Sequence, residues 1–121
     1  MKRKHSPKKA PHVPSTHPFI GTWVQTENPF HRTTVVFTVT VKAGHFLVRG
    51  VEEEDHTTFK ISRVKWDGEC LRFVSLFPPT NHKAEHVFRL IGRGRINHNV
   101  TYTDEEGTYT DDERWEKRSR G

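Results

Sequence analysis

The sequence predicts an all-β domain, an eight-stranded antiparallel up-and-down barrel that follows a basic N-terminal arm. From Phe19 onward, apolar and polar residues alternate, which is the pattern of strands that bury one face. Turn-forming residues interrupt this alternation at short intervals, and no helical stripe is longer than a turn. Short connections place each strand beside its predecessor, and eight twisted strands are enough to close a barrel.

The alternation divides the chain into predicted strands that end at turn signals. They cover residues 19–27, 32–42, 45–51, 57–66, 70–77, 84–91, 95–103 and 108–117. Within the strand 57–66 the apolar phase changes, which predicts a bulge near Ser62 and Arg63. A three-residue turn at 92–94 predicts the strand pairs Ile91 with Arg95, Phe88 with His98, and His86 with Val100. This register keeps the apolar side chains of both strands on one face.

The formal net charge of +5 belongs entirely to the first 18 residues. This segment contains no acid, is rich in proline and has few apolar residues, so we expect residues 1–18 to be a disordered arm. Its basic side chains are candidates for contacts with nucleic acid or an acidic protein: Lys2, Arg3, Lys4, Lys8 and Lys9. Residues 19–121 carry equal numbers of basic and acidic side chains and are predicted to form a single folded domain.

Length and composition exclude several classes of protein. A chain of 121 residues has room for one hydrophobic core. No apolar run approaches the ~20 residues of a membrane-spanning helix, and the first residues lack the apolar stretch of a secretory signal. The single cysteine, Cys70, excludes an intramolecular disulfide and has no convincing catalytic partner. We therefore expect a cytoplasmic protein without a membrane span.

Gly21-Thr22-Trp23, in the first predicted strand, resembles the Gly-x-Trp signature that opens lipocalins and related calycin barrels. By strand pattern, the resemblance covers about residues 19–117. It implies a calycin-like barrel in which Trp23 plugs the closed end. It also implies that a basic side chain of the last strand, Arg114 or Arg118, packs across this tryptophan. The resemblance implies a fold and a style of binding, and leaves the ligand open.

The predicted meander places alternate loops at opposite ends of the barrel. Loops 28–31, 52–56, 78–83 and 104–107 would share an acidic open mouth, whereas 43–44, 67–68 and 92–94 would share a basic closed end with both chain termini. Three histidines, His31, His56 and His82, fall on mouth loops, where they could bind a metal or respond to pH. Their spacing matches no metal-binding motif, so no metal site is predicted.

The predicted register turns His98 into the barrel, on one face with Ile96 and Val100 and diagonal to His86. A buried imidazole needs a hydrogen-bond partner, which Tyr102, Ser75 or water could supply. Alternatively, His98 could contact a ligand or hold a haem iron. The predicted ligand-binding residues are Phe37, Phe73, Ser75, Phe88, His98 and Tyr102.

The function expected from these features is non-catalytic binding of a small, mostly apolar ligand inside the barrel, without a cofactor. The alternative is an interaction module whose basic arm binds nucleic acid or an acidic protein partner. An enzyme would need a second catalytic group beside His98 or His86, and the sequence identifies none. No catalytic residue is therefore predicted.

Overall fold

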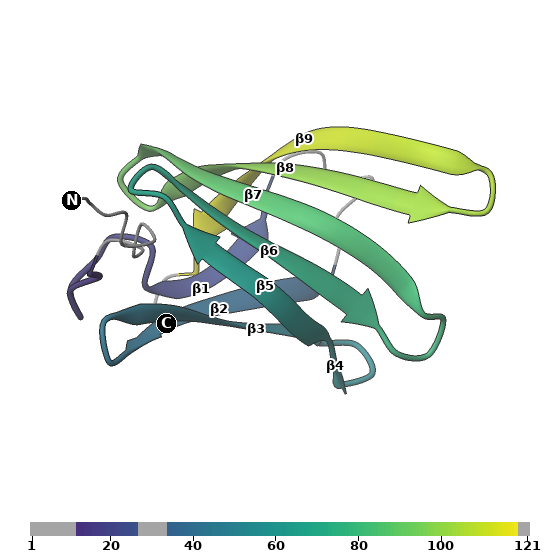
Figure 1. Ribbon diagram of the computed structural model, residues 1–121, viewed down its shortest axis with the longest axis horizontal. Helices are drawn as coiled ribbons and strands as arrows, with labels where there is room; N and C mark the ends of the chain where they lie inside the picture. Colours follow the sequence, from purple (N-terminus) through teal and green to yellow (C-terminus); the bar gives the residue numbers. More distant parts are fainter. Residues whose placement is uncertain (1–11, 27–33, 119–121) are drawn as a thin grey trace, which may run out of the picture.

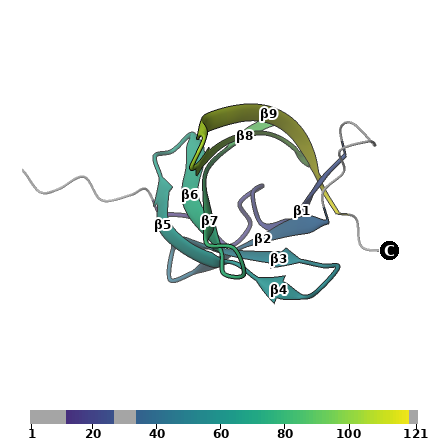
Figure 2. The same cartoon turned by 90° about the vertical axis from the view of Figure 1, so that its right-hand side faces the viewer.

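The computed structural model describes residues 12–26 and 34–118, which form one antiparallel sheet curled into a barrel (Figures 1 and 2). Its strands are β1 (Gly21–Gln25), β2 (Val35–Lys42), β3 (His45–Glu52), β4 (Thr57–Thr58), β5 (Lys60–Trp66), β6 (Cys70–Phe77), β7 (His82–Gly92), β8 (Arg95–Asp104) and β9 (Gly107–Lys117). The order across the sheet is β4-β3-β2-β1-β9-β8-β7-β6-β5. In these two segments, no helix is long and apolar enough to cross a membrane. The predicted all-β meander is confirmed.

The barrel is nearly closed, and its seam does not lie between the first and last strands. Strands β1 and β9 pair directly, with Trp23 opposite Lys117 and Gln25 opposite Trp115. The free edges of the sheet are β4 and β5, which only Phe59 separates along the chain. The Phe59 N–H donates a hydrogen bond of 2.9 Å to the Gly50 carbonyl of β3. This contact holds the chain where it passes from one edge of the sheet to the other.

The structure has nine strands rather than the eight predicted, because the predicted strand 57–66 is two strands. Its first residues, β4, pair with β3, whereas β5 pairs with β6 on the other side of the seam. A single straight strand cannot reach both partners, so the break at Phe59 follows from closing the sheet. The predicted bulge is confirmed, since the register shifts between Ser62 and Lys65 and Arg63 has a φ of 53°.

The predicted pairing of β7 and β8 is mostly confirmed. Phe88 lies opposite His98 and His86 lies opposite Val100. The predicted pair of Ile91 with Arg95 is wrong, because Gly92 lies opposite Arg95 and a register shift falls between Leu90 and Gly92. The extra residue in this shift, Ile91, is 44% exposed. The bulge therefore turns the hairpin without moving the apolar face.

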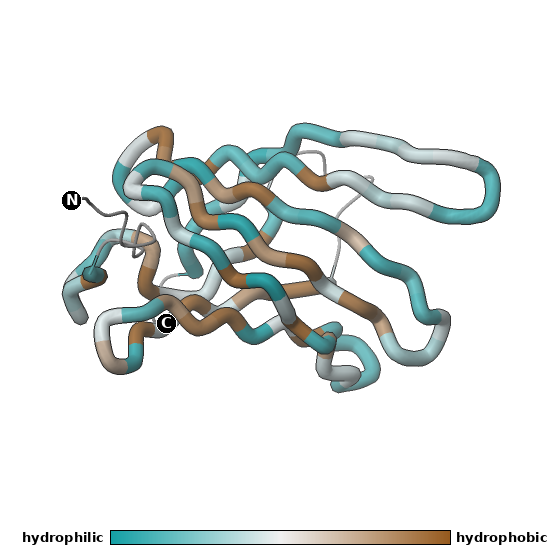
Figure 3. The backbone as a smooth tube through the Cα atoms, in the orientation of Figure 1, coloured by the Kyte–Doolittle hydropathy of each residue, from teal (hydrophilic) through white to brown (hydrophobic). Residues whose placement is uncertain are grey.

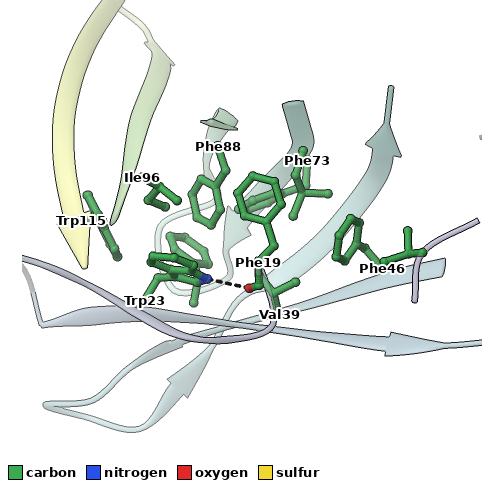
Figure 4. Close-up of a cluster of buried hydrophobic side chains, with 11 residues drawn as sticks. Phe19, Trp23, Val39, Phe46, Phe73, Phe88, Ile96 and Trp115 are labelled. Atoms are coloured by element: carbon green, nitrogen blue, oxygen red, sulfur yellow. Dashed lines mark hydrogen bonds between the residues drawn. The ribbon is translucent and has the colours of Figure 1, made fainter. Parts of the chain in front are cut away.

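An aromatic core fills the closed half of the barrel (Figure 4). Trp23 is fully buried, and its Nε1 donates a 2.8 Å hydrogen bond to the Phe19 carbonyl. The basic side chain over this ring is Lys117, whose Nζ lies 5.4 Å from the ring centroid. The prediction that Arg114 covers the ring is wrong, because Arg114 alternates with buried Trp115 and faces the outside of the barrel. The other candidate, Arg118, instead forms an ion pair of 2.8 Å with Glu53.

Residues 12–18 pack against the closed end of the barrel, so the prediction of a disordered arm is wrong for this part of it. Val13 is 2% exposed, and its N–H donates a 2.9 Å hydrogen bond to the Gly44 carbonyl. The His17 ring lies 5.1 Å from the ring centroids of both Phe46 and Trp66. A Cβ at Gly44, where φ is +79°, would lie 2.4 Å from His12 Nδ1, so this close approach requires glycine. Residues 1–11 lie outside the described residues.

Replacing Val13 by aspartate should destabilise the barrel far more than the same change at exposed Ser15. Val13→Asp places a charge among apolar side chains, and we expect it to lower the free energy of unfolding by about 2–4 kcal/mol. Ser15→Asp adds the same charge two residues away in solvent and should change it by less than about 0.5 kcal/mol. Urea unfolding followed by tryptophan fluorescence measures both. Equal effects would contradict the observed packing of this segment.

Candidate ligand-binding site

A cavity of about 700 Å³ opens at the end of the barrel opposite the aromatic core. Its rim includes His82 and Lys83 at the start of β7, and Thr103 and Asp104 at the end of β8. The β8–β9 hairpin extends beyond the other strands at this end (Figure 1). His82, Lys83 and Asp104 belong to two of the four predicted mouth loops, 78–83 and 104–107. No residue of loop 52–56 lines the cavity, and loop 28–31 lies outside the described residues.

One wall of the cavity is apolar and aromatic. It consists of Val35 and Phe37 from β2, Phe59 from the seam, Phe77 from β6 and Ala84 from β7. Phe59 links the other two rings, with centroids 6.2 Å from Phe37 and 5.1 Å from Phe77. Figure 3 shows that β2 and β6, which contribute to this wall, are mainly hydrophobic, whereas the outer part of the β8–β9 hairpin is mainly hydrophilic.

The opposite wall is the inner face of β9, where two acidic side chains lie between two aromatic ones. Buried Trp115 sets the phase, which places Glu113, Asp111 and Tyr109 on the same inner face. The facing residues of β8 are His98 opposite Glu113, Val100 opposite Asp111, and Tyr102 opposite Tyr109. The carboxylates of Asp111 and Glu113 therefore line one side of the cavity. They lie between the tyrosine pair at the rim and Trp115 further inside the barrel.

Three buried side chains form a chain of hydrogen bonds at the floor of the cavity. Ser75 Oγ lies 2.7 Å from His86 Nε2, and His86 Nδ1 lies 2.8 Å from His98 Nε2. These residues are 3%, 5% and 2% exposed, and all three line the cavity. Sequence analysis named Tyr102, Ser75 or water as the hydrogen-bond partner of His98, but the partner is His86, which lies between His98 and Ser75. Tyr102 is 41% exposed and lies at the rim instead.

The carboxylate of Glu113 determines the direction of these hydrogen bonds. Glu113 Oε1 accepts a 2.9 Å hydrogen bond from Trp115 Nε1 and lies 3.4 Å from His98 Nδ1, a buried nitrogen that forms no hydrogen bond with the described residues. A carboxylate only accepts, so it favours the His98 tautomer with its proton on Nδ1. His98 Nε2 then accepts from the Nδ1–H of His86, and His86 Nε2 accepts from the hydroxyl of Ser75. One negative charge at the wall therefore orients all three groups.

The imidazoles are neutral because they are buried. Burial, together with the neighbouring His98, lowers the pKa of His86 to about 2. Burial also lowers the pKa of His98, against the opposing effect of the adjacent Glu113 carboxylate. Partial burial acts to raise the pKa of Glu113, but the adjacent His98 imidazole and the hydrogen bond from Trp115 lower it overall. The site thus keeps a charged carboxylate beside two uncharged rings.

Four of the six predicted ligand-binding residues line the cavity, and two do not. Phe37, Ser75, His98 and Tyr102 are in its walls. Phe73 and Phe88 face inward as predicted, but they are packed in the core below the imidazoles, with ring centroids 5.2 Å apart. Whether the four lining residues bind a ligand stays a prediction.

Sequence reasoning missed the acidic wall and its tyrosine partner, namely Tyr109, Asp111 and Glu113. Charged residues on an alternating strand are usually assigned to the solvent face. The strand 108–117 was predicted, but which of its side chains face inward was not. The available signal was Trp115, because a buried tryptophan places residues two, four and six positions earlier on its own face.

The remaining predicted contacts fall elsewhere. Within residues 12–26 and 34–118, no group of three or more His, Cys, Asp or Glu side chains is arranged to hold a metal. His56 and His82 are exposed at the mouth, and His31 lies outside the described residues. So do Lys2, Arg3, Lys4, Lys8 and Lys9, the predicted contacts for nucleic acid or an acidic partner. Arg114 lines a separate groove on the outer face of β6 to β9, together with Arg72, Arg89 and Arg95.

The buried imidazoles should make the barrel lose stability in mild acid. Their pKa values are lowered in the folded state, so below pH ~6.5 the unfolded chain binds more protons and the free energy of unfolding falls. Each histidine contributes a slope of up to about 1.4 kcal/mol per pH unit. Chemical unfolding from pH 7 to 5 should give a smaller slope for His86→Gln and for His98→Gln than for the original chain.

His17, whose pKa is lowered by burial and by Lys117, adds to the acid slope in every one of these proteins and cancels in the comparison. If the free energy of unfolding of a variant changed with pH as steeply as that of the original chain, the replaced imidazole would not be neutral and buried in the folded state.

In comparisons with known proteins, no family model, curated protein or solved structure matches this chain. The structure is a nearly closed antiparallel barrel compatible with a calycin-like fold, and the arguments for function rest on its cavity.

Proposed function

We propose that the barrel binds a small, mostly apolar molecule in its cavity, as a non-catalytic binding protein of the lipocalin-like type. The observation that carries the proposal is a cavity of about 700 Å³ with one aromatic wall and with polar groups on the opposite wall, at the rim and at the floor. Small-molecule sites have volumes of ~300–1,000 Å³ and this same division of lining, in which apolar walls supply affinity and few polar groups supply orientation.

The floor of the cavity supports a ligand with one polar group at its inner end. Ser75 uses its hydroxyl proton on His86, so its oxygen can still accept a hydrogen bond from a ligand. The histidines behind it are buried and neutral, which holds that oxygen in one position without placing a charge against an apolar ligand. The floor is therefore organised before binding, which reduces the entropy lost when a ligand is held.

The pair of Ser75 and His86 also resembles the nucleophile and base of a hydrolase, so catalysis is the competing function. Two features of the pair favour binding instead. A general base works best with a pKa near the operating pH, and the pKa of His86 is lowered to about 2. Ser75 also lies within strand β6, where the backbone N–H groups take part in sheet pairing and cannot form an oxyanion hole.

Binding can be measured with 2-naphthylmethanol, a neutral aromatic probe, by isothermal titration calorimetry. We expect one saturable site with a Kd of about 10 µM to 1 mM. Ala84→Leu and Ala84→Trp fill the cavity from its wall and should weaken binding in that order, with at least a tenfold loss for tryptophan.

Val87→Trp is the matched control, because Val87 lies on the same strand and lines the outer groove instead of the cavity. It should bind the probe as the original chain does. An equal loss in Val87→Trp and Ala84→Trp, or the absence of saturable binding in the original chain, would refute a ligand site in the barrel.

A fluorophosphonate probe separates binding from hydrolysis. Because we propose no activated nucleophile, we expect no covalent labelling of the folded protein as measured by intact-protein mass spectrometry. Labelling that disappears in Ser75→Ala would establish an activated serine and replace the binding proposal with a hydrolase.

A further inference from the structure

We propose that the ligand carries a positively charged group, a substituted ammonium, which binds at the inner face of the β8–β9 hairpin while its apolar body lies against the aromatic wall. This inference rests on the proposed binding function and adds the charge of the ligand to it. It is carried by three features of the cavity: a tyrosine pair, two carboxylates below that pair, and the absence of a lysine or arginine paired with them among residues 12–26 and 34–118.

The tyrosine pair lies at the rim. Tyr102 and Tyr109 are directly opposite each other on β8 and β9, both line the cavity, and they remain 41% and 48% exposed. Large aromatic side chains left partly exposed at a cavity entrance offer ring faces to an incoming molecule. Aromatic faces carry partial negative charge and attract cations, and substituted ammonium groups are favourable partners because they are weakly hydrated.

The two carboxylates lie on the same strand, further into the cavity. Asp111 and Glu113 follow Tyr109 at alternate positions of β9, so they are about 7 and 14 Å along the strand from it. Within the described part of the chain, neither of them forms an ion pair with a lysine or arginine. The nearest basic group to Glu113 is the imidazole of His98, which burial keeps neutral. Among the described residues, no lysine or arginine is thus paired with the carboxylates of this wall.

The other charged groups of the cavity do not reverse this polarity. Asp104 adds a third carboxylate at the rim. Among the described lining residues, the only lysine or arginine is Lys83, which is exposed on β7 opposite Thr103 of β8 and alternates with inward-facing Ala84, so its side chain lies on the outer face. An anionic ligand such as a fatty acid would place its charge beside the carboxylates of β9 or bury it against Phe59 and Phe77, and both placements are unfavourable. A cation beside β9 is attracted to both the carboxylates and the rings.

Three soluble ligands with the same naphthalene body test the inference by isothermal titration calorimetry at low ionic strength. They are (2-naphthylmethyl)trimethylammonium, 2-naphthylmethanol and 2-naphthylacetate, which carry a positive charge, no charge and a negative charge. We expect the cation to bind at least tenfold more tightly than the alcohol, and the acid more weakly than the alcohol. Added salt should reduce the preference for the cation.

Asp111→Asn and Asp112→Asn are a matched pair of variants. They remove the same charge from adjacent residues, but Asp111 faces the cavity and Asp112 faces the outer groove. Asp111→Asn should reduce the ratio of cation to alcohol affinity at least threefold and leave the alcohol affinity unchanged. Asp112→Asn should leave both unchanged. Tyr109→Phe should retain the preference for the cation and Tyr109→Leu should reduce it, because the ring face rather than the hydroxyl is proposed to act.

Failure of this inference differs from failure of the proposed function. If the alcohol binds and the cation binds no better, or if Asp111→Asn and Asp112→Asn behave alike, the charge preference is wrong and the binding function stands. If none of the three ligands binds at millimolar concentration, the proposed function fails and this inference fails with it.

Discussion

The hydrogen bond between His86 and His98 divides the barrel into a packed half and a hollow half. Phe73 stacks on His86 at 4.6 Å between centroids, and Phe88 and Trp115 contact His98 at 4.9 and 4.8 Å. The same two imidazoles form the floor of the cavity on their other side. His86 is hydrogen-bonded through both ring nitrogens and His98 through Nε2, whereas His98 Nδ1 has no hydrogen-bond partner among the described residues and lies 3.4 Å from the Glu113 carboxylate. Breaking one of these buried hydrogen bonds would cost about 1–3 kcal/mol. A one-residue slip between β7 and β8 would break the bond between His86 and His98, so register, core and cavity depend on one another.

Closure of the sheet gives the barrel one sealed end and one open end. Residues 12–20 lie across the closed end, where Phe19, His17 and Trp66 pack on one another, and Lys117 lies over Trp23. At the other end, β8 and β9 continue beyond the core with their inner faces still alternating inward. Phe19, Trp23, Phe46, Phe73, Phe88 and Trp115 are packed in the core of the closed half. The open half is left with a wall of tyrosines and carboxylates, which makes it hollow and polar on one side.

Most of the fold was predictable because period-two alternation and turn residues are local signals. The strands β6 and β8 were predicted to within one residue, and so were the bulge after Ser62 and the pairing of Phe88 with His98. The errors share one cause, which is contact between segments distant in sequence. Val13 and His17 are ordered by Gly44, Phe46 and Trp66. Likewise, β4 and β5 are separate because they pair with different strands, and no local pattern contains that information.

Sequence by itself determined the class of this protein: an antiparallel all-β meander with an inward-facing His98, a buried Trp23 and a mouth at the end of loops 78–83 and 104–107. Alternation decides which side chains face inward, and short turns decide which strands are neighbours. Only the tertiary structure decided which inward positions fill the core and which line a cavity. Whether an inward-facing residue fills the core or lines the cavity depends on its position along the barrel axis. The tertiary structure places Phe73 and Phe88 below the imidazoles, and it brings Ser75, His86, His98 and Glu113 from four separate strands into one connected site.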